Sequence, residues 1–184
     1  MTCVVGIIKA GTVFIGADSC SSNCSYASIY KNPKVFRRGE LLFGFTTSWR
    51  MGQLLEHNLS VPSRPEGITD LAYLIAHLVP AMRSCFKEGG FAEIKNAQES
   101  GGTFLIGYRG SLYEVDSDFQ VGQWVNEYAA VGSGMYVALG SLHATSAFDP
   151  EERIKLALQA ATDHTPYVRP PFTIMQQPEK GPTP

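Results

Sequence analysis

Hydrophobic residues gather in short runs over the first part of the chain, which is typical of β-strands joined in hairpins. Residues 1–8 and 12–17 are apolar runs on either side of Lys9-Ala10-Gly11, so we predict two strands with a tight turn between them. Similar runs predict two further hairpins and two single strands, at residues 35–45, 103–116, 128–131 and 172–175.

Elsewhere, apolar residues recur every three or four positions, which is the spacing of one face of an α-helix. This spacing predicts four helices, at about residues 48–58, 68–86, 134–145 and 151–162. Pro80 should kink or split the second helix, because proline lacks the backbone N–H of a helix interior. We interpret the stretch 87–102 as a loop.

The composition limits the class of protein. The 184 residues suit one domain, which we assign to residues 1–175, with 176–184 as a flexible C-terminal tail. Hydrophobic residues make up 44% of the chain, enough to bury a core. The formal net charge of −2 offers no basic surface for nucleic acid. No apolar run reaches the roughly 18 residues of a membrane span, and we see no leader ahead of Thr2, so we expect no membrane contact and a cytoplasmic location.

The cysteines do not follow a metal-binding or secreted pattern. Cys3, Cys20, Cys24 and Cys85 lack the two-pair spacing of a zinc site. Cys20-x-x-x-Cys24 has no nearby His or second pair to complete four ligands. We therefore interpret the cysteines as reduced structural thiols and predict no metal site.

The first 34 residues carry the candidate chemistry. Removal of Met1 would leave Thr2 with a hydroxyl and an α-amine on one residue, and an α-amine has a reference pKa of about 7.7–8. Such a residue is a nucleophile with its own general base. A nearby Lys34 would lower the effective pKa of the hydroxyl, and Asp18 would hold Lys34 in place. Taken singly, each residue has an ordinary structural interpretation: Thr2 as the first residue of a strand, Lys34 as a surface charge and Asp18 as a turn former.

Taken together, these residues resemble a known family. The string Thr2…Gly16-Ala17-Asp18-Ser19…Lys34-Val35, with the later Tyr128-Ala129-Ala130-Val131-Gly132-Ser133-Gly134, resembles a proteasome β-type subunit. The bacterial heat-shock-locus peptidase is a relative, and both are N-terminal-nucleophile (Ntn) hydrolases. The resemblance runs from Thr2 to about Ala161. It implies an α+β fold, the four-layer αββα sandwich of two antiparallel sheets between helix layers. It also implies a homo-oligomeric ring and an ATP-dependent unfoldase as a further partner.

The resemblance also implies roles for residues beyond the nucleophile and its charged neighbours. Ser133 would lie beside the amine of the nucleophile and help to relay its proton. Thr46-Thr47-Ser48, just before the first predicted helix, can cap that helix. Backbone amides at the start of a helix can also stabilise an oxyanion. The family's oxyanion donor maps to Thr47, with Ser48 as its neighbour, although the family usually has glycine there. We add Ser22 to the substrate-binding candidates.

The loop after the last predicted helix departs from the proteasome pattern. That pattern has an Asp followed by a Ser-Gly near the nucleophile, and this chain has Asp163-His164-Thr165-Pro166-Tyr167. Asp163 is therefore the candidate for the late catalytic Asp, and the Ser-Gly is absent. The heat-shock peptidase also lacks it, and carbonyls of its loop can hold a monovalent cation. We expect no required cofactor and, at most, such a cation.

Two variants of the N-terminus would change the chemistry. Cys3 stands where the family usually has Thr, so trimming by one residue more would create an N-terminal thiol nucleophile. Retention of Met1 would instead move the amine one residue along and leave Thr2 without its base.

The sequence thus predicts a threonine endopeptidase that hydrolyses peptides or unfolded proteins inside a ring. One alternative is a non-proteolytic Ntn amidase with the same chemistry and no chamber. The other is a catalytically inactive, structural ring subunit. The combination of Thr2, Asp18, Lys34 and Ser133 argues against the second alternative, because a scaffold does not need all four.

Overall fold

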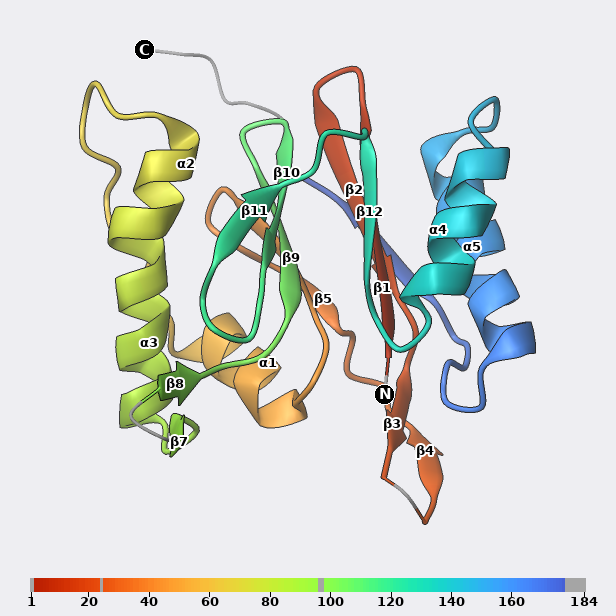
Figure 1. Cartoon of the computed structure of the whole chain (residues 1–184), viewed down its shortest axis with the longest axis horizontal. Helices are drawn as coiled ribbons and strands as arrows, with labels where there is room; N and C mark the ends of the chain where they lie inside the picture. The colour runs from red at the N-terminus through yellow and green to blue at the C-terminus, as the bar shows by residue number, and fades with distance from the viewer. Residues whose placement is uncertain (1, 24, 96–97, 178–184) are drawn as a thin grey trace.

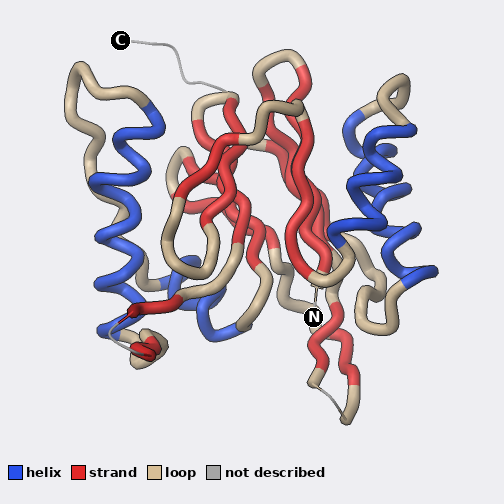
Figure 2. Tube along the Cα trace, in the orientation of Figure 1, coloured by secondary structure: helices blue, strands red, loops and turns tan. Residues whose placement is uncertain are grey.

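The computed structural model describes residues 2–23, 25–95 and 98–177. Two antiparallel sheets stand face to face, and helices cover the outer face of each (Figure 1). Figure 2 shows the same order of layers, helix, sheet, sheet and helix. This arrangement is the four-layer αββα sandwich, so the expected fold class is confirmed.

The first sheet has the strand order β12-β1-β2-β13 and so places the start of the chain at its centre. Its strands are β1 (Cys3–Lys9), β2 (Thr12–Ala17), β12 (Tyr128–Gly132) and β13 (Thr173–Gln176). Ala10 and Gly11 form the predicted turn with φ of 48° and 75°, the positive values that a two-residue hairpin favours. In the register of β1, Val4 lies opposite both Ala17 and Val131. The start of β1 therefore leaves the sheet beside the end of β2 and the end of β12.

The second sheet has the order β11-β10-β9-β6-β5 and is antiparallel throughout. Its strands are β5 (Val35–Arg38), β6 (Leu41–Phe45), β9 (Phe104–Tyr108), β10 (Ser111–Val115) and β11 (Val121–Gln123). Lys34 immediately precedes β5 and Thr46 immediately follows β6. Because these two strands are antiparallel neighbours, the two residues leave the sheet at the same end.

Helices form the two outer layers. On the second sheet lie α1 (Trp49–His57), α2 (Asp70–Tyr73) and α3 (Val79–Glu88), and on the first lie α4 (Met135–Ala144) and α5 (Pro150–His164) (Figure 1). A π-helical segment, Leu74–Leu78, joins α2 to α3. Pro80 lies in the first turn of α3, where a missing N–H is tolerated. Tyr73, Leu74, Leu78 and Val79 all keep right-handed helical angles, so the helix passes through this region without the predicted split, and only its hydrogen-bond register changes ahead of Pro80.

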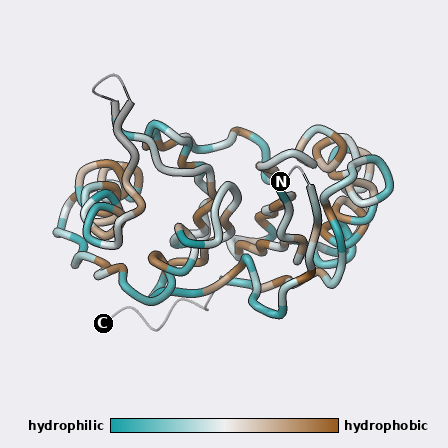
Figure 3. Tube along the Cα trace, turned by 90° about the horizontal axis from the view of Figure 1, so that it is seen from below, coloured by the Kyte–Doolittle hydropathy of each residue, from teal (hydrophilic) through white to brown (hydrophobic). Residues whose placement is uncertain are grey.

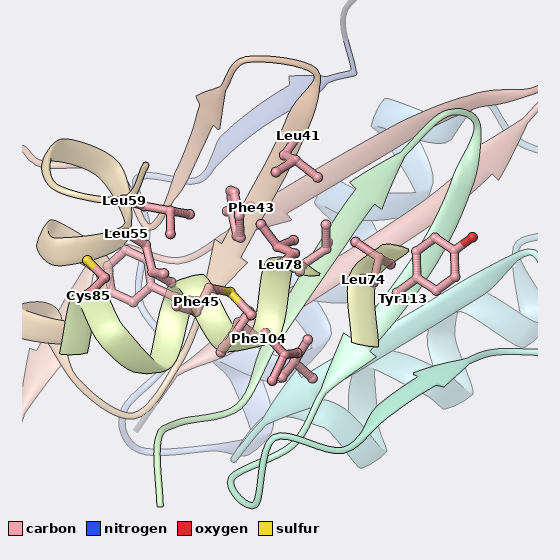
Figure 4. Packing of buried hydrophobic residues seen from close by; sticks show 14 of the residues in the cluster. Leu41, Phe43, Phe45, Leu55, Leu59, Leu74, Leu78, Cys85, Phe104 and Tyr113 are labelled. Carbon is pink, nitrogen blue, oxygen red and sulfur yellow. The ribbon is translucent and has the colours of Figure 1, made fainter. Parts of the chain in front are cut away.

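Three buried clusters fill the three spaces between the four layers. Alternate residues of a strand face opposite sides of its sheet, so Val5 and Ile7 pack against α4 and α5 whereas Val4 faces the second sheet. Phe43 and Phe45 belong to the cluster under α1 and α3, seen in close-up in Figure 4. The outer helices carry both hydrophobic and hydrophilic residues when viewed from below (Figure 3). This is the pattern of helices with one face in the core.

Some elements differ from the sequence prediction. The stretch expected to be a loop at 87–102 contains β7 (Glu93–Lys95) and β8 (Gln98–Ser100), which pair with each other. β3 (Cys20–Ser22) and β4 (Ala27–Ile29) form a hairpin that projects from the body beside the N-terminus (Figure 1). These strands have three residues each, too few for an alternating pattern to stand out from the surrounding polar residues.

The proposed tail begins later than expected. Gln176 belongs to β13, and Gln177 is 6% exposed, with its backbone N–H donating to the Val13 oxygen at 2.7 Å. The remainder of the tail, 178–184, lies outside the described residues. In the part of the chain that the structure describes, no helix combines the length and the apolar character needed to cross a bilayer.

Candidate active site

Lys34 is the centre of a buried cluster at the start of β1. Its ammonium nitrogen donates to Thr2 Oγ1 at 2.8 Å, to Asp18 Oδ1 at 2.9 Å and to the backbone oxygen of Cys20 at 2.6 Å. Thr2 is 6% exposed, and Asp18 and Lys34 are each 1% exposed. An ammonium has three protons to donate, so each proton meets an acceptor. The fold therefore brings the three charged and nucleophilic candidates from the sequence into direct contact.

Backbone pairing explains why these groups meet. Thr2 precedes β1 and Asp18 follows β2, so the two leave neighbouring antiparallel strands at the same edge. The Asp18 carboxylate accepts from the backbone N–H of Cys3 at 3.0 Å and of Cys20 at 2.9 Å. Lys34 arrives from the second sheet, which packs face to face with the first. Asp18 is thus fixed by the backbone on both sides of it and holds Lys34 in turn.

Burial sets the charge behaviour of Lys34. Removal from water lowers the pKa of its ammonium below the ordinary 10.5, and the neighbouring Asp18 carboxylate partly counteracts this because it favours the charged form. A lysine with a lowered pKa exchanges its proton more readily near neutral pH. The cluster therefore presents a cation to the Thr2 hydroxyl, and the proton of that cation is comparatively easy to move.

The turn Gly132-Ser133-Gly134 lies on the other side of Thr2. The Thr2 backbone nitrogen donates to Ser133 Oγ at 3.2 Å, and Ser133 Oγ lies 3.3 Å from the Thr2 backbone oxygen, to which it donates. Gly132 has a φ of +92°, and a Cβ there would clash with the same oxygen. Glycine at 132 thus allows the close approach. Ser133 lies beside the nitrogen that would become the α-amine once Met1 is removed.

Thr46, Thr47 and Ser48 connect β6 to α1 through a γ-turn. The Ser48 N–H donates to the Thr46 oxygen at 2.7 Å, and the central Thr47 has a φ of +62°, the rarer and more strained kind of γ-turn. Ser48 Oγ accepts from the N–H groups of Arg50 and Met51 and so caps α1. Within the described residues, the Thr47 N–H donates to no partner. Of the two amides considered for an oxyanion, that of Thr47 is therefore the available one.

Contacts with Thr103 hold this strained turn. Thr47 Oγ1 accepts from the Thr103 N–H at 3.2 Å, and Thr46 Oγ1 donates to the Thr103 oxygen at 2.7 Å. The two threonine hydroxyls lie 3.1 Å apart. Positive φ is unfavourable for a β-branched residue, at a cost of about 1–3 kcal/mol. These contacts explain how a threonine occupies a position where the family usually has glycine.

Thr2 lies between two hollows in the surface. The larger is a cleft of about 570 Å³ that Thr2 borders together with Thr47 and Ser133. Glu114 and Asp116 line the same cleft. Sites for small molecules and short peptide segments have this order of volume. The three residues that the resemblance makes candidates for nucleophile, oxyanion amide and proton relay thus border one cleft.

The smaller hollow, of about 40 Å³, lies on the Lys34 side of Thr2. Ser22, Ser48 and Trp49 line it together with Thr2, so both serines predicted to bind substrate border the candidate nucleophile. Lys34 Nζ lies 5.5 Å from the centre of the Trp49 ring, near enough for the ring face to attract the cation.

The structure does not bring Asp163 into this cluster. Helix α5 continues to His164, and the exposed Asp163 carboxylate accepts from Gln159 Nε2 of the same helix at 2.7 Å. The chain reaches the site after α5 instead. There the Ser19 N–H donates to the Arg169 oxygen at 3.0 Å, and the Arg169 N–H donates to Asp18 Oδ2 at 3.5 Å. The expectation of a late catalytic Asp at position 163 therefore has no support in these contacts.

The same loop contains the carbonyls that the resemblance would assign to a monovalent cation. Arg169 Nη1 donates to the backbone oxygens of Thr162, Thr165 and Val168, at 3.2, 3.0 and 2.7 Å. The carbonyls converge on this guanidinium nitrogen, so the residues present do not fit an added cation. Across the described ranges, no group of three or more His, Cys, Asp or Glu side chains is placed to hold a metal ion.

Cys3 is in a poor position to act as a nucleophile. It is fully buried, and burial raises the pKa of its thiol to about 12. The thiolate is the reactive form, and it would be scarce at neutral pH. Cys3, Cys20 and Cys85 are buried free thiols, in keeping with a structural role, and Cys24 lies outside the described residues.

Two residues of this site carried no signal in the sequence. Thr103 follows a glycine pair at the start of a strand, and Arg169 lies in a loop between helix and strand. Each uses its own backbone atoms to contact a segment far away in the sequence, and such contacts leave no periodic pattern. Nothing near Arg169 in the sequence indicated which residues it would contact.

Comparison with solved structures identifies the fold. The chain is similar to Thiobacillus denitrificans BPH in complex with epoxomicin, with a TM-score of 0.79 and 19% identity over 95% of this chain and 97% of that chain. It is also similar to eukaryotic HslV from Trypanosoma brucei, with a TM-score of 0.67 and 16% identity over 95% of this chain and 98% of that one. Anbu, an ancestral beta-subunit from Yersinia bercovieri, gives a TM-score of 0.68 and 12% identity over 96% and 82%.

No protein-family model and no curated protein matches the sequence. Identities this low show the fold alone. The chain has the Ntn-hydrolase fold of proteasome-like and HslV-type proteins, as the resemblance in its residues implied.

Proposed function

We propose that this chain is a threonine-type peptidase whose nucleophile is Thr2 after removal of Met1. The observation that carries the proposal is the 2.8 Å hydrogen bond from Lys34 Nζ to Thr2 Oγ1, within a cluster buried from water. A strand start that is merely structural gains nothing from a buried lysine aimed at a hydroxyl. Because burying a charge is costly unless it is paired, the full pairing of Lys34 favours a chemical role.

The proposed reaction begins with attack by Thr2 Oγ1 on a peptide carbonyl. The α-amine of Thr2 takes the hydroxyl proton, with Ser133 Oγ as relay, since that hydroxyl lies 3.2 Å from the nitrogen. The Lys34 ammonium stabilises the negative charge that develops on Oγ1. The Thr47 amide donates to the carbonyl oxygen as it becomes an oxyanion.

Collapse of the intermediate breaks the carbon–nitrogen bond and leaves an ester on Thr2. The leaving amine takes the proton that the α-amine had accepted. A water molecule then gives its proton to the α-amine and attacks the ester carbonyl. The second tetrahedral intermediate then collapses: the ester bond to Thr2 Oγ1 breaks, the α-ammonium returns its proton to Oγ1, and the acid leaves. Microscopic reversibility assigns Lys34 and the Thr47 amide the same roles in this second half.

We also propose that the active form is a homo-oligomeric ring that takes peptides or unfolded protein, with an ATP-dependent unfoldase as partner and a cytoplasmic location. An exposed apolar surface on the projecting hairpin supports assembly, since such patches on soluble proteins often mark interaction sites. Tyr26, Ile29 and Tyr30 are 61%, 50% and 41% exposed there. Partner, location and ring size stay predictions.

The test is intact mass on the purified protein, before and after treatment with epoxomicin. This epoxyketone needs both a free α-amine and its hydroxyl, and the similar BPH structure carries the compound. We expect the wild-type chain to lose Met1 and to gain one adduct per chain. The Thr2→Ala variant should form no adduct and should cleave no peptide. Thr12→Ala, at the far end of β2, is the matched control and should react fully.

Retained Met1 without an adduct would instead support a structural subunit. Reaction with epoxomicin combined with failure to cut denatured protein, in a small oligomer, would favour the non-proteolytic amidase.

A further inference from the structure

The loop between α5 and β13 contains a charge that the proposed mechanism does not use. Three backbone oxygens converge on Arg169 Nη1, at 3.2 Å from Thr162, 3.0 Å from Thr165 and 2.7 Å from Val168. The first belongs to the last turn of α5, and the second to its C-cap residue. We call these three oxygens the carbonyl cage. Carbonyls at a helix C-terminus carry partial negative charge and favour a cation.

The backbone of Arg169 contacts the catalytic cluster directly. Its N–H lies 3.5 Å from Asp18 Oδ2, to which it donates, and its oxygen accepts from the Ser19 N–H at 3.0 Å. Ser19 Oγ also donates to the Pro171 oxygen at 2.6 Å. One residue therefore ties the end of α5, by its side chain, to the segment that holds Asp18, by its backbone.

A cage of backbone carbonyls is the kind of site that binds hard cations, since oxygen is their preferred ligand. In this chain the guanidinium sits at the point where the three oxygens meet. Its charge is tethered to the protein and is not supplied by the solution. An added monovalent ion would have to displace it.

We propose that Arg169 is a positioning residue that replaces a monovalent cation: its guanidinium occupies the carbonyl cage and so fixes the loop that braces Asp18, without any bound metal. The stability of the wild-type chain is then independent of the identity of the cation in solution. The effect on catalysis rests on the proposed function, whereas the effect on stability does not.

The first measurement is the thermal midpoint of unfolding in potassium, sodium or choline chloride at equal ionic strength. Choline is too large for the cage. We expect the wild-type Tm to be the same in all three salts. Arg169→Ala vacates the cage, so its Tm should be lower in choline and rise with potassium or sodium. Arg169→Met fills the space without a charge, and its Tm should be low in every salt.

The control is Arg37→Ala. Arg37 also donates to a backbone oxygen, that of Gln176, but it is exposed on the edge strand of the second sheet. Its loss should not create any difference between salts. If Arg169→Ala does not fold, the wild-type measurement still decides, because a wild-type Tm or peptidase rate that requires potassium or sodium would overturn the proposal.

The second measurement is peptide hydrolysis in the same salts. Arg169→Ala should lose about 10- to 100-fold in kcat in choline, the range that a small misplacement of catalytic groups costs, with KM little changed and partial recovery in potassium or sodium. Unchanged kcat in Arg169→Ala, or a Tm that ignores the salt, would overturn the proposal. A wild-type chain without peptidase activity, combined with a salt-dependent Tm in Arg169→Ala, would overturn the proposed function and leave the cage standing.

Discussion

The two sides of the candidate site are held by different physical means. On one side, Lys34 and Asp18 are each 1% exposed and form a charged network in which every ammonium proton has an acceptor. On the other, the turn at Thr47 is partly exposed, has a strained φ of +62°, and depends on neutral hydroxyl contacts with Thr103.

This difference indicates what each side contributes. A buried ion pair resists change because separating it leaves an uncompensated charge in a place without water. A strained turn resists change only as far as its surroundings hold it. The charged side should therefore control both folding and chemistry, and the turn side should control chemistry with little effect on folding.

The largest effect should come from breaking the ion pair. Lys34→Met keeps the length of the side chain but removes the charge, so we expect loss of peptide cleavage and a destabilisation of about 3–5 kcal/mol, because Asp18 is left buried and unpaired. The double variant Lys34→Met/Asp18→Asn should be more stable than Lys34→Met alone. Urea unfolding and peptide hydrolysis measure the two effects.

Lys155→Met provides the matched control. Its ammonium lies 3.9 Å from Glu151 in an exposed pair, so stability and activity should hardly change. Equal stability losses in the single and the double variant of the buried pair would contradict the uncompensated-charge explanation.

A smaller effect is expected from the turn. Thr47→Ala removes the hydroxyl that accepts from Thr103 and keeps the strain, so kcat should fall about tenfold, below the 100- to 1,000-fold that loss of a whole oxyanion donor costs. KM should change little, because the amide acts mainly in the transition state.

Two variants separate the hydroxyl from the strain. Thr47→Ser retains the hydroxyl and should stay close to wild type in kcat. Thr47→Gly relieves the strain, so its Tm should not fall. It also lacks the hydroxyl, so its kcat should fall about as far as that of Thr47→Ala. A Thr47→Gly chain with undiminished kcat would show that the tie to Thr103 has no part in catalysis.

The smallest effect is a shift in the pH profile. Burial lowers the pKa of Lys34 below 10.5, and Asp18 opposes this. Between the lowered folded-state pKa and 10.5, the unfolded chain binds more protons than the folded one, so this group makes the free energy of unfolding rise with pH. Activity should fall over the same window, because the ammonium is lost.

Replacement of Asp18 sharpens this prediction. Asp18→Asn removes the group that favours the charged form, so the alkaline limb of kcat/KM should move to lower pH in whatever activity remains. The measurement is the pH–rate profile of both proteins together with urea unfolding across the same range. An alkaline limb that does not move would mean that Lys34 does not set it.

The comparison between sequence and structure follows a similar division. The strands at 35–38 and 41–45 and their turn are set by neighbouring residues, and the structure has them at those positions. The helix at 68–86 does not divide but contains a π-helical segment, Leu74–Leu78, just ahead of Pro80, because the consequence of a proline is local. Likewise, Asp18 directly follows one predicted strand and Lys34 directly precedes another. Once the family resemblance supplied the order of the layers, these positions along the chain were enough to predict that both lie near Thr2.

The errors came from contacts between segments far apart in the sequence. Whether Asp163 reaches the site depends on where α5 stops, and the helix runs to His164, two residues beyond its predicted end, which keeps Asp163 on the helix. Arg169 matters because the loop after α5 and the segment after β2 meet in space.

The sequence by itself thus predicted the strands and helices of the two main sheets and their outer layers, and the contact of Thr2 with its charged neighbours, because these follow from residue types, their spacing and the family resemblance. The tertiary structure alone decided which amide is available at the Thr46–Ser48 turn, what holds Thr47 at positive φ, and which cation occupies the carbonyl cage. Each of these depends on where particular backbone atoms lie in three dimensions, and a linear pattern does not encode such positions.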